Sequence, residues 1–149
     1  VKWADLVAEN FRPGIMDKLG FGYERCKQWN PRIIYAANSG YGPSGEWSLR
    51  PSYDAIAQGF AGSMHKQGGG PSHEPKEIAF AFSDEVGATN FSFSIVTALL
   101  ARERTGTGQK IETSQTGASL EFQRHDFQNV LYYGRVNKQD QDTGLPPFG

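Results

Sequence analysis

The segment RIIYAANSGYG, residues 32–42, carries the clearest β-strand signal in the chain. β-branched and aromatic residues come first and a Ser-Gly run follows, which is typical of a strand that ends in a loop. A helical pattern lies on each side. The first covers residues 22–30 and ends before Pro31, and the second covers residues 52–64 with apolar residues at helical spacing. The segment therefore predicts a strand between helices.

The rest of the chain repeats this alternation. The remaining predicted elements are a strand at 4–11, a short helical turn at 15–20, a long helix at 89–104, a strand at 109–114 and a final helix at 115–134. Strands separated by helices favour an α/β fold with a parallel sheet, that is, a Rossmann-like layer. In such sheets ligands bind at the carboxyl ends of the strands. Functional side chains are therefore expected in the segments that follow the strands.

Length and composition limit the classes of protein. The 149 residues are 38% hydrophobic and 21% charged with a net charge of −1, which indicates one globular domain over 1–149. Basic residues are scattered, so no nucleic-acid partner is expected. No run reaches the roughly 18 apolar residues of a membrane span, so no membrane is expected either. Residues 65–77 are rich in Gly and Pro and predict a flexible loop.

Cysteine and histidine usage argues against cross-links and metals. Cys26 is the single cysteine, so an internal disulfide is impossible and a reducing, cytoplasmic location fits. The three histidines have no metal-ligand spacing, and we expect no metal. The chain opens almost at once on a strand and closes on the loop DTGLPPFG, which suggests a piece of a larger protein.

Asp84 is the most notable candidate, because it lies where the long helical pattern begins. One interpretation is a helix N-cap, whose carboxylate accepts free backbone N–H groups. The other is a reactive carboxylate, with N–H groups near the helix start stabilising developing negative charge. The two roles are compatible. Glu85 is interpreted as a solvated acid of the first turn.

Two other places carry polar or aromatic candidates. Asn10, Phe11 and Arg12 precede a helix start, which suits a phosphate or pyrophosphate but also describes an ordinary Pro-Gly turn with a surface Arg. Tyr53 stands at the start of its helix beside Asp54. It is expected in the core or at the rim of the site, where its phenol would donate to a carbonyl oxygen. The residues alone thus predict an α/β domain with a possible acidic site.

Four motifs together resemble the family III coenzyme A transferases, which include formyl-CoA and carnitine-CoA transferases and related 2-methylacyl-CoA racemases. These motifs are ADLVAENFRPGIMDKLGFGYE, NPRIIYAANSGYGPSG, RPSYDAIAQ and TALLARERTGTGQKIETS. The resemblance runs from about residue 3 to about residue 125. It implies that the chain is part of the large domain of a longer protein that forms interlaced homodimers.

The resemblance also implies a reaction and its residues. The nucleophilic aspartate of the family precedes the helix that ends in RERTGxGQ, and Asp84 matches it. In the family this aspartate attacks an acyl-CoA, and CoA passes through an aspartyl thioester to a carboxylic acid acceptor, with coenzyme A as a substrate. Asn10 and Phe11 match the segment that helps to hold CoA, Arg12 belongs to the same loop, and Lys18 and Leu19 fall near its adenine end.

Tyr53 separates two activities within the family. It matches a tyrosine of the transferases, whereas the racemases carry a histidine there. Departures from the family pattern are Ser83 before the aspartate, Gly117 in place of an aspartate, and an unusual 65–77 stretch. The sequence also leaves open an inactive α/β module that binds only CoA or a partner chain.

Overall fold

The computed structural model describes residues 1–79 and 81–134. Its centre is a parallel sheet of three strands in the order β1 (Leu6–Glu9), β2 (Ile34–Ser39) and β3 (Gln109–Ser114). The register places Ala8 beside Ala36 and Ala36 beside Ile111. All three strands lie within segments predicted as strands, so the parallel α/β architecture is confirmed.

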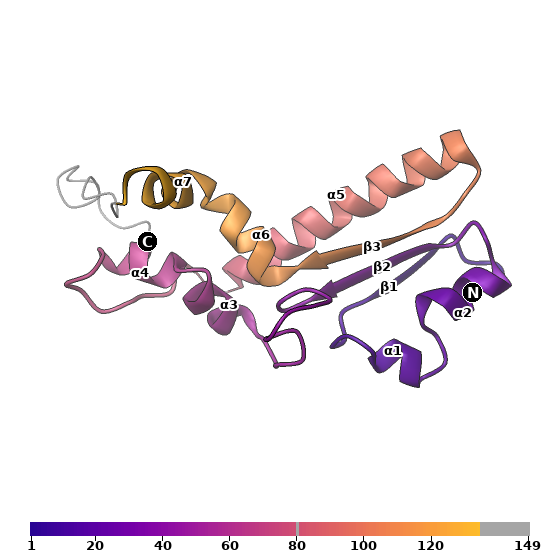
Figure 1. The fold of residues 1–149 in the computed structure, drawn as a ribbon, viewed down its shortest axis with the longest axis horizontal. Coiled ribbons are helices and arrows are strands. Elements are labelled where there is room, and N and C mark those ends of the chain that lie inside the picture. Colours follow the sequence, from indigo (N-terminus) through magenta and orange to yellow (C-terminus); the bar gives the residue numbers. More distant parts are fainter. Residues whose placement is uncertain (80, 135–149) are drawn as a thin grey trace.

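Helices cover this sheet and extend beyond its carboxyl edge (Figure 1). The described helices are α1 (Ile15–Lys18), α2 (Tyr23–Trp29), α3 (Asp54–Phe60), α4 (Ser63–Gly68), α5 (Phe82–Thr105), α6 (Gln115–Phe122) and α7 (Arg124–Tyr133). In Figure 1, α1 and α2 lie on one side of the strands and α5 runs along the other. The arrowheads of all three strands point toward α3, α6 and the start of α5.

The two faces of the sheet have different cores. Cys26, Ile33 and Tyr35 form a buried cluster on the side of α2, with Val7 and Ala37 packed against it. Side chains alternate along a strand, so Ile34 and Ala36, which are also fully buried, face α5 instead. β2 is thus buried on both faces, as expected for the central strand of a parallel sheet.

Helix α5 lies close to the sheet because the residues it buries are mostly small. They are Ser83, Gly87, Ala98 and Arg102. The apolar residues that recur at helical spacing in α5, namely Phe91, Ile95, Leu99, Val96 and Leu100, are only partly covered, and Val96 and Leu100 are exposed together with Phe93. We call Phe93, Val96 and Leu100 the outer apolar face of α5.

The far end of α5 is fixed by Arg102, which is 7% exposed. Its guanidinium donates to the backbone oxygens of Asp5 and Arg32, both at 3.3 Å, and pairs with the Asp5 carboxylate at 3.0 Å. These residues precede β1 and β2, so Arg102 ties the helix to the strands at their amino ends. The helix then ends at Gly106, whose φ of 76° allows a left-handed cap.

Four segments differ from the sequence predictions. The predicted helix at 52–64 is two helices, α3 and α4, separated at Gly62 with its left-handed φ of 80°. The long helix begins at Phe82, not at residue 89, because a side chain from α3 caps it. The predicted 65–77 loop is wrong at its start, since residues 65–68 belong to α4. The predicted final helix is two helices that meet at Gln123, whose side chain donates instead to the backbone oxygens of Ala61 and Ser119.

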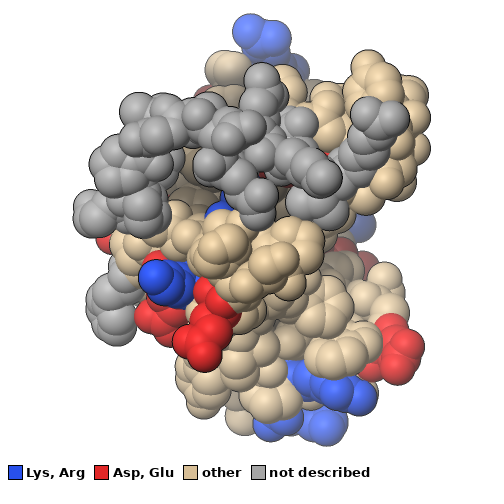
Figure 2. Space-filling model, turned by 90° about the vertical axis from the view of Figure 1, so that its left-hand side faces the viewer, with Lys and Arg blue, Asp and Glu red and all other residues tan. Residues whose placement is uncertain are grey.

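The surface has no dominant charge on the face seen in Figure 2, where acidic and basic side chains both lie among uncharged ones. Among the described helices, none has the length and apolar character needed to cross a membrane. Cys26 is a free, buried thiol.

Candidate functional site

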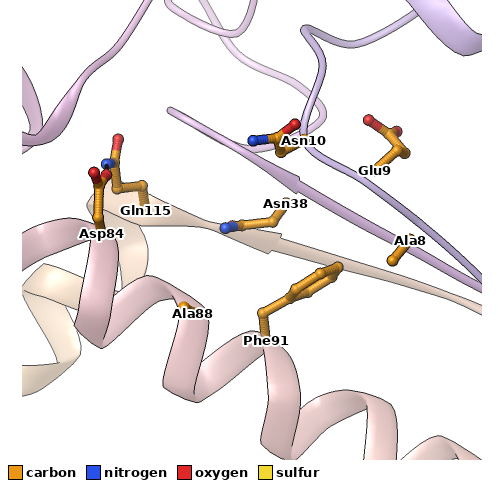
Figure 3. A pocket seen from close by; sticks show the side chains of 8 residues that line it. All are labelled: Ala8, Glu9, Asn10, Asn38, Asp84, Ala88, Phe91 and Gln115. Carbon is orange, nitrogen blue, oxygen red and sulfur yellow. Dashed lines mark hydrogen bonds between the residues drawn. The ribbon is translucent and has the colours of Figure 1, made fainter.

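A cleft of about 430 Å³ lies between α5 and the carboxyl edge of the sheet (Figure 3). It is lined by Ala8, Glu9, Asn10, Asn38, Asp84, Ala88, Phe91 and Gln115. Every strand contributes to it near its carboxyl end: Asn10 directly follows β1, Asn38 belongs to β2, and Gln115 directly follows β3. The position at this edge agrees with the prediction for a parallel α/β sheet.

The structure shows that Asp84 is not the N-cap of its helix. Ala81 occupies that position with a left-handed φ of 61°, and Asp84 lies within the first turn. The cap comes from Asp54 of α3, whose Oδ1 accepts the backbone N–H of Ser83 at 2.6 Å and that of Asp84 at 3.2 Å. The Asp84 carboxylate is therefore free of the capping role.

The other N–H groups of this first turn are also occupied. The N–H of Phe82 donates to the Ala79 oxygen at 3.4 Å, and that of Glu85 donates to the Ala81 oxygen at 2.9 Å. The expectation that free N–H groups at the helix start would stabilise developing charge is therefore wrong for this structure.

Gln58 holds Asp54 and the segment before α5 together. It is fully buried, and its Nε2 donates to Asp54 Oδ2 at 2.8 Å and to the Ala79 oxygen at 3.0 Å. Its Oε1 accepts the N–H of Ile78 at 2.9 Å. Because these bonds use both amide hydrogens of Gln58, the cap is tied to the chain that leads into α5.

Gln115 is the direct partner of the Asp84 carboxylate. Its Nε2 donates to Asp84 Oδ1, and its Oε1 accepts the hydroxyl of Ser52 at 3.1 Å. Figure 3 shows the two side chains in contact at one end of the cleft. Asn38 accepts the Thr113 hydroxyl at 3.1 Å through Oδ1, and its Nδ2 is directed along the cleft.

The electrostatics of Asp84 follow from these neighbours. Burial raises the pKa of the Asp84 carboxyl above its ordinary value, and the nearby negative charge of Asp54 raises it further. The hydrogen bond from Gln115 lowers the pKa, because it favours the ionised form. Asp84 is exposed at the cleft, has one oxygen bound by Gln115 and has a raised pKa, and a carboxylate of this kind has the chemistry of a nucleophile.

The structure separates the other sequence candidates. Asn10 lines the cleft with Asp84. Tyr53 does not line it; it occupies the N-cap position of α3 without a side-chain capping bond and is 73% exposed, so of the two expected positions, core and rim, the core position is wrong. Arg12 and Lys18 are exposed, as is Leu19 at 59%.

Phe11 lies instead at a second pocket of about 470 Å³ on the α1–α2 side of the sheet. Glu9, Tyr35, Lys110 and Glu112 also line it. Burial raises the pKa of Glu9 and of Tyr35, while Lys110 pairs with Glu112 at 2.6 Å. Asn10 and Phe11 are thus neighbours in sequence that face different pockets.

Four residues of the site were missed from the sequence: Asp54, Gln58, Gln115 and Asn38. The spacing of Asp54 and Gln58 on one helix face was a usable signal for a polar pair. The contacts of Gln115 and Asn38 depend on how β2, β3 and α5 meet, which no local pattern shows. No cluster of three or more potential metal ligands occurs in residues 1–79 and 81–134.

The fold is a parallel α/β fold, and Asp84 lies in a cleft at the carboxyl ends of its strands. The whole chain, residues 1–149, matches the model of CoA-transferase family III, and the chain belongs to that family. The resemblance deduced from the sequence is therefore confirmed.

Named relatives agree with this family. The chain is 44% identical to an acetyl-CoA:oxalate CoA-transferase of Acetobacter aceti over 84% of its own length and 32% of the relative's. It is 34% identical to a formyl-CoA:oxalate CoA-transferase of Streptomyces coelicolor over 97% of its length and 35% of the relative's. The chain thus spans about a third of the length of these relatives.

A solved structure shows the same fold. A crystal structure of a CAIB/BAIF family protein from Brucella suis superposes with a TM-score of 0.85 and 36% identity. The superposition covers 92% of this chain and 36% of that one.

Proposed function

We propose that this chain carries the reactive carboxylate of an enzyme that transfers coenzyme A from an acyl-CoA to a carboxylic acid. The observation that carries the proposal is Asp84, placed in a cleft at the carboxyl ends of all three strands in a chain of CoA-transferase family III. Two relatives are named as CoA-transferases that act on oxalate, which supports a small dicarboxylate as acceptor.

The proposed reaction starts with attack by a carboxylate oxygen of Asp84 on the thioester carbonyl carbon. A C–O bond forms and the C–S bond breaks, which yields a mixed anhydride and CoA thiolate. The thiolate then attacks the Asp84 carbonyl carbon, forms an aspartyl thioester and releases the first acid. The acceptor repeats these two steps in reverse order, leaves as its CoA ester and regenerates Asp84. Each exchange replaces one activated acyl bond by another, so the free-energy change of each step is small.

The residues around the cleft support substrate binding in this proposal. Asn38 Nδ2 and the Asn10 side chain offer uncharged donors beside Asp84. Phe11, Arg12, Lys18 and Leu19 would contact the nucleotide part of CoA, for which an exposed position is suitable. Tyr53, exposed at the start of α3, would contact substrate at the rim.

The test is covalent trapping. The chain, within the protein its gene encodes, is incubated with acetyl-CoA or formyl-CoA and oxalate, and hydroxylamine is added to convert an anhydride or thioester into a hydroxamate. We expect the hydroxamate at Asp84 and formation of oxalyl-CoA. Asp84→Asn should abolish both, while Glu85→Gln, a change to the next carboxylate on the helix, should leave both intact.

Other outcomes would decide for the alternatives. CoA binding without a hydroxamate or transfer would contradict the proposal and favour an inactive module that binds CoA or a partner chain. Exchange of the α-hydrogen of a 2-methylacyl-CoA without transfer would favour a racemase, although Tyr53 in place of a histidine argues against that activity.

We also propose that the enzyme is a homo-oligomer, most simply a dimer. The outer apolar face of α5, formed by Phe93, Val96 and Leu100, supports burial against further protein. Light scattering of the purified protein tests this, and a monomer at micromolar concentration would contradict it.

A further inference from the structure

Gln115 occupies a constrained position beside the candidate nucleophile. It is 9% exposed and begins α6, where the Ser114 hydroxyl caps the helix by accepting the Gly117 N–H at 3.0 Å. A Cβ at Gly87 of α5 would lie 3.5 Å from its Cα, so the two helices touch at this point. The backbone of Gln115 is therefore fixed by both helices.

The amide of Gln115 has one orientation that satisfies its neighbours. A carboxylate only accepts hydrogen bonds, so the NH₂ group has to face Asp84 Oδ1. The oxygen then faces Ser52, whose hydroxyl donates to it at 3.1 Å. The chain of donors runs from Ser52 through Gln115 to Asp84 and ends on a single carboxylate oxygen.

We propose that Gln115 is a positioning residue for Asp84: it holds Oδ1 and leaves Oδ2 as the attacking oxygen. This inference rests on the proposed function. When Oδ2 has been acylated, Oδ1 is the carbonyl oxygen of the anhydride. The CoA thiolate then attacks the side-chain carbonyl carbon of Asp84. A C–S bond forms and negative charge moves onto Oδ1, after which the bond from this carbon to Oδ2 of the departing acid breaks. The Gln115 amide N–H already donates to Oδ1, the oxygen on which this charge develops.

The charged groups near Asp84 allow a specific titration test. Asp54 faces it from α3, Glu9 lines the same cleft from β1, and Glu85 is its neighbour on α5. Gln115 itself carries no charge. A change of Gln115 to an uncharged side chain of similar size therefore alters the pKa of Asp84 chiefly through the lost hydrogen bond.

The experiment compares Gln115→Met with the native chain. The carboxyl groups of the full chain are labelled with ¹³C-aspartate and titrated by NMR, with Asp84→Asn assigning the Asp84 signal. We expect the pKa of Asp84 to rise in Gln115→Met, and not in Gln28→Met, which changes an exposed glutamine of α2. Transfer assays of the same variants should show kcat falling about 10²-fold with KM nearly unchanged.

The results separate the inference from the function on which it rests. An unchanged pKa of Asp84 in a folded Gln115→Met chain would overturn the inference, even if transfer is observed. Absence of transfer in the native protein would overturn the proposed function, while a raised pKa would still establish the contact. Should Gln115→Met unfold, Ser52→Ala replaces it. That variant frees the amide to rotate, so a smaller rise in the pKa of Asp84 is expected, and an unchanged pKa again overturns the inference.

Discussion

Replacing Asp54 by alanine removes the side chain that caps the first turn of α5. The backbone N–H groups of Ser83 and Asp84 lose their acceptor, and one N–H of the buried Gln58 loses its partner. Loss of a cap costs about 1 kcal/mol and an unpaired buried donor costs about another 1–2 kcal/mol. We expect Asp54→Ala to lower the free energy of unfolding by about 2–3 kcal/mol.

Asp54→Asn separates the cap from the charge. Its remaining oxygen still accepts the two backbone N–H groups, and only the bond to Gln58 is lost, so the expected destabilisation is about 1 kcal/mol. The negative charge that raises the pKa of Asp84 is gone, and that pKa should fall toward its ordinary value. In a transferase this shifts the acidic limb of the kcat/KM profile to lower pH, because the carboxylate forms at lower pH.

Urea unfolding and ¹³C NMR titration of Asp84 measure the two effects separately. Glu85→Gln is the control, since it removes a charge from the same helical turn without removing the cap. Equal stability of native and Asp54→Ala chains would refute the capping argument. An unchanged pKa of Asp84 in Asp54→Asn would refute the electrostatic one.

Three further predictions concern stability, each followed by urea unfolding. Asp84→Asn should be more stable than the native chain at neutral pH. Because the pKa of Asp84 is raised in the folded state, the native chain loses stability as the pH rises through that pKa. The difference between the two chains should therefore vanish as the pH falls below the ordinary carboxyl pKa. Arg102→Met should cost about 1–3 kcal/mol, because it removes the guanidinium hydrogen bonds to the backbone oxygens of Asp5 and Arg32, of which the Asp5 oxygen keeps the Ile34 N–H, while the exposed Arg104→Met should cost almost nothing; equal effects would contradict the role of Arg102. Gly108→Ala should cost about 1–3 kcal/mol, because a Cβ there collides with the Ile33 carbonyl oxygen, and full stability would show that this approach is not tight.

The sheet was predictable because its strands are marked locally. β2 has β-branched and aromatic residues followed by Ser-Gly, and Gly106 marks the end of α5. The start of α5 was not predictable in the same way. Its cap, Asp54, lies 29 residues before Ser83 in sequence and on another helix, so a search for a cap near residue 84 does not find it.

The candidate site shows the same division. Asp84 was found from the sequence as an acid at a helix start, and the family motifs strengthened that choice. Gln115 is an ordinary glutamine in the sequence, and its role appears only when the turn after β3 meets α5. Tyr53 was expected in the core or at the rim, and its 73% exposure at the start of α3 excludes the core. The chemical character of a residue can therefore be read from the sequence, whereas its hydrogen-bond partners on other helices and strands cannot.

Helix α5 carries Asp84 near one end and the buried Arg102 near the other. At about 1.5 Å per residue, the two lie about 27 Å apart along a single stiff helix. A tilt of about 2° at the Arg102 end therefore moves Asp84 by about 1 Å, a displacement that costs an enzyme about 10²-fold in rate. The contacts of Arg102 at the amino ends of the strands, where no substrate binds in this proposal, thus help to set the position of Asp84 at the opposite end of the sheet.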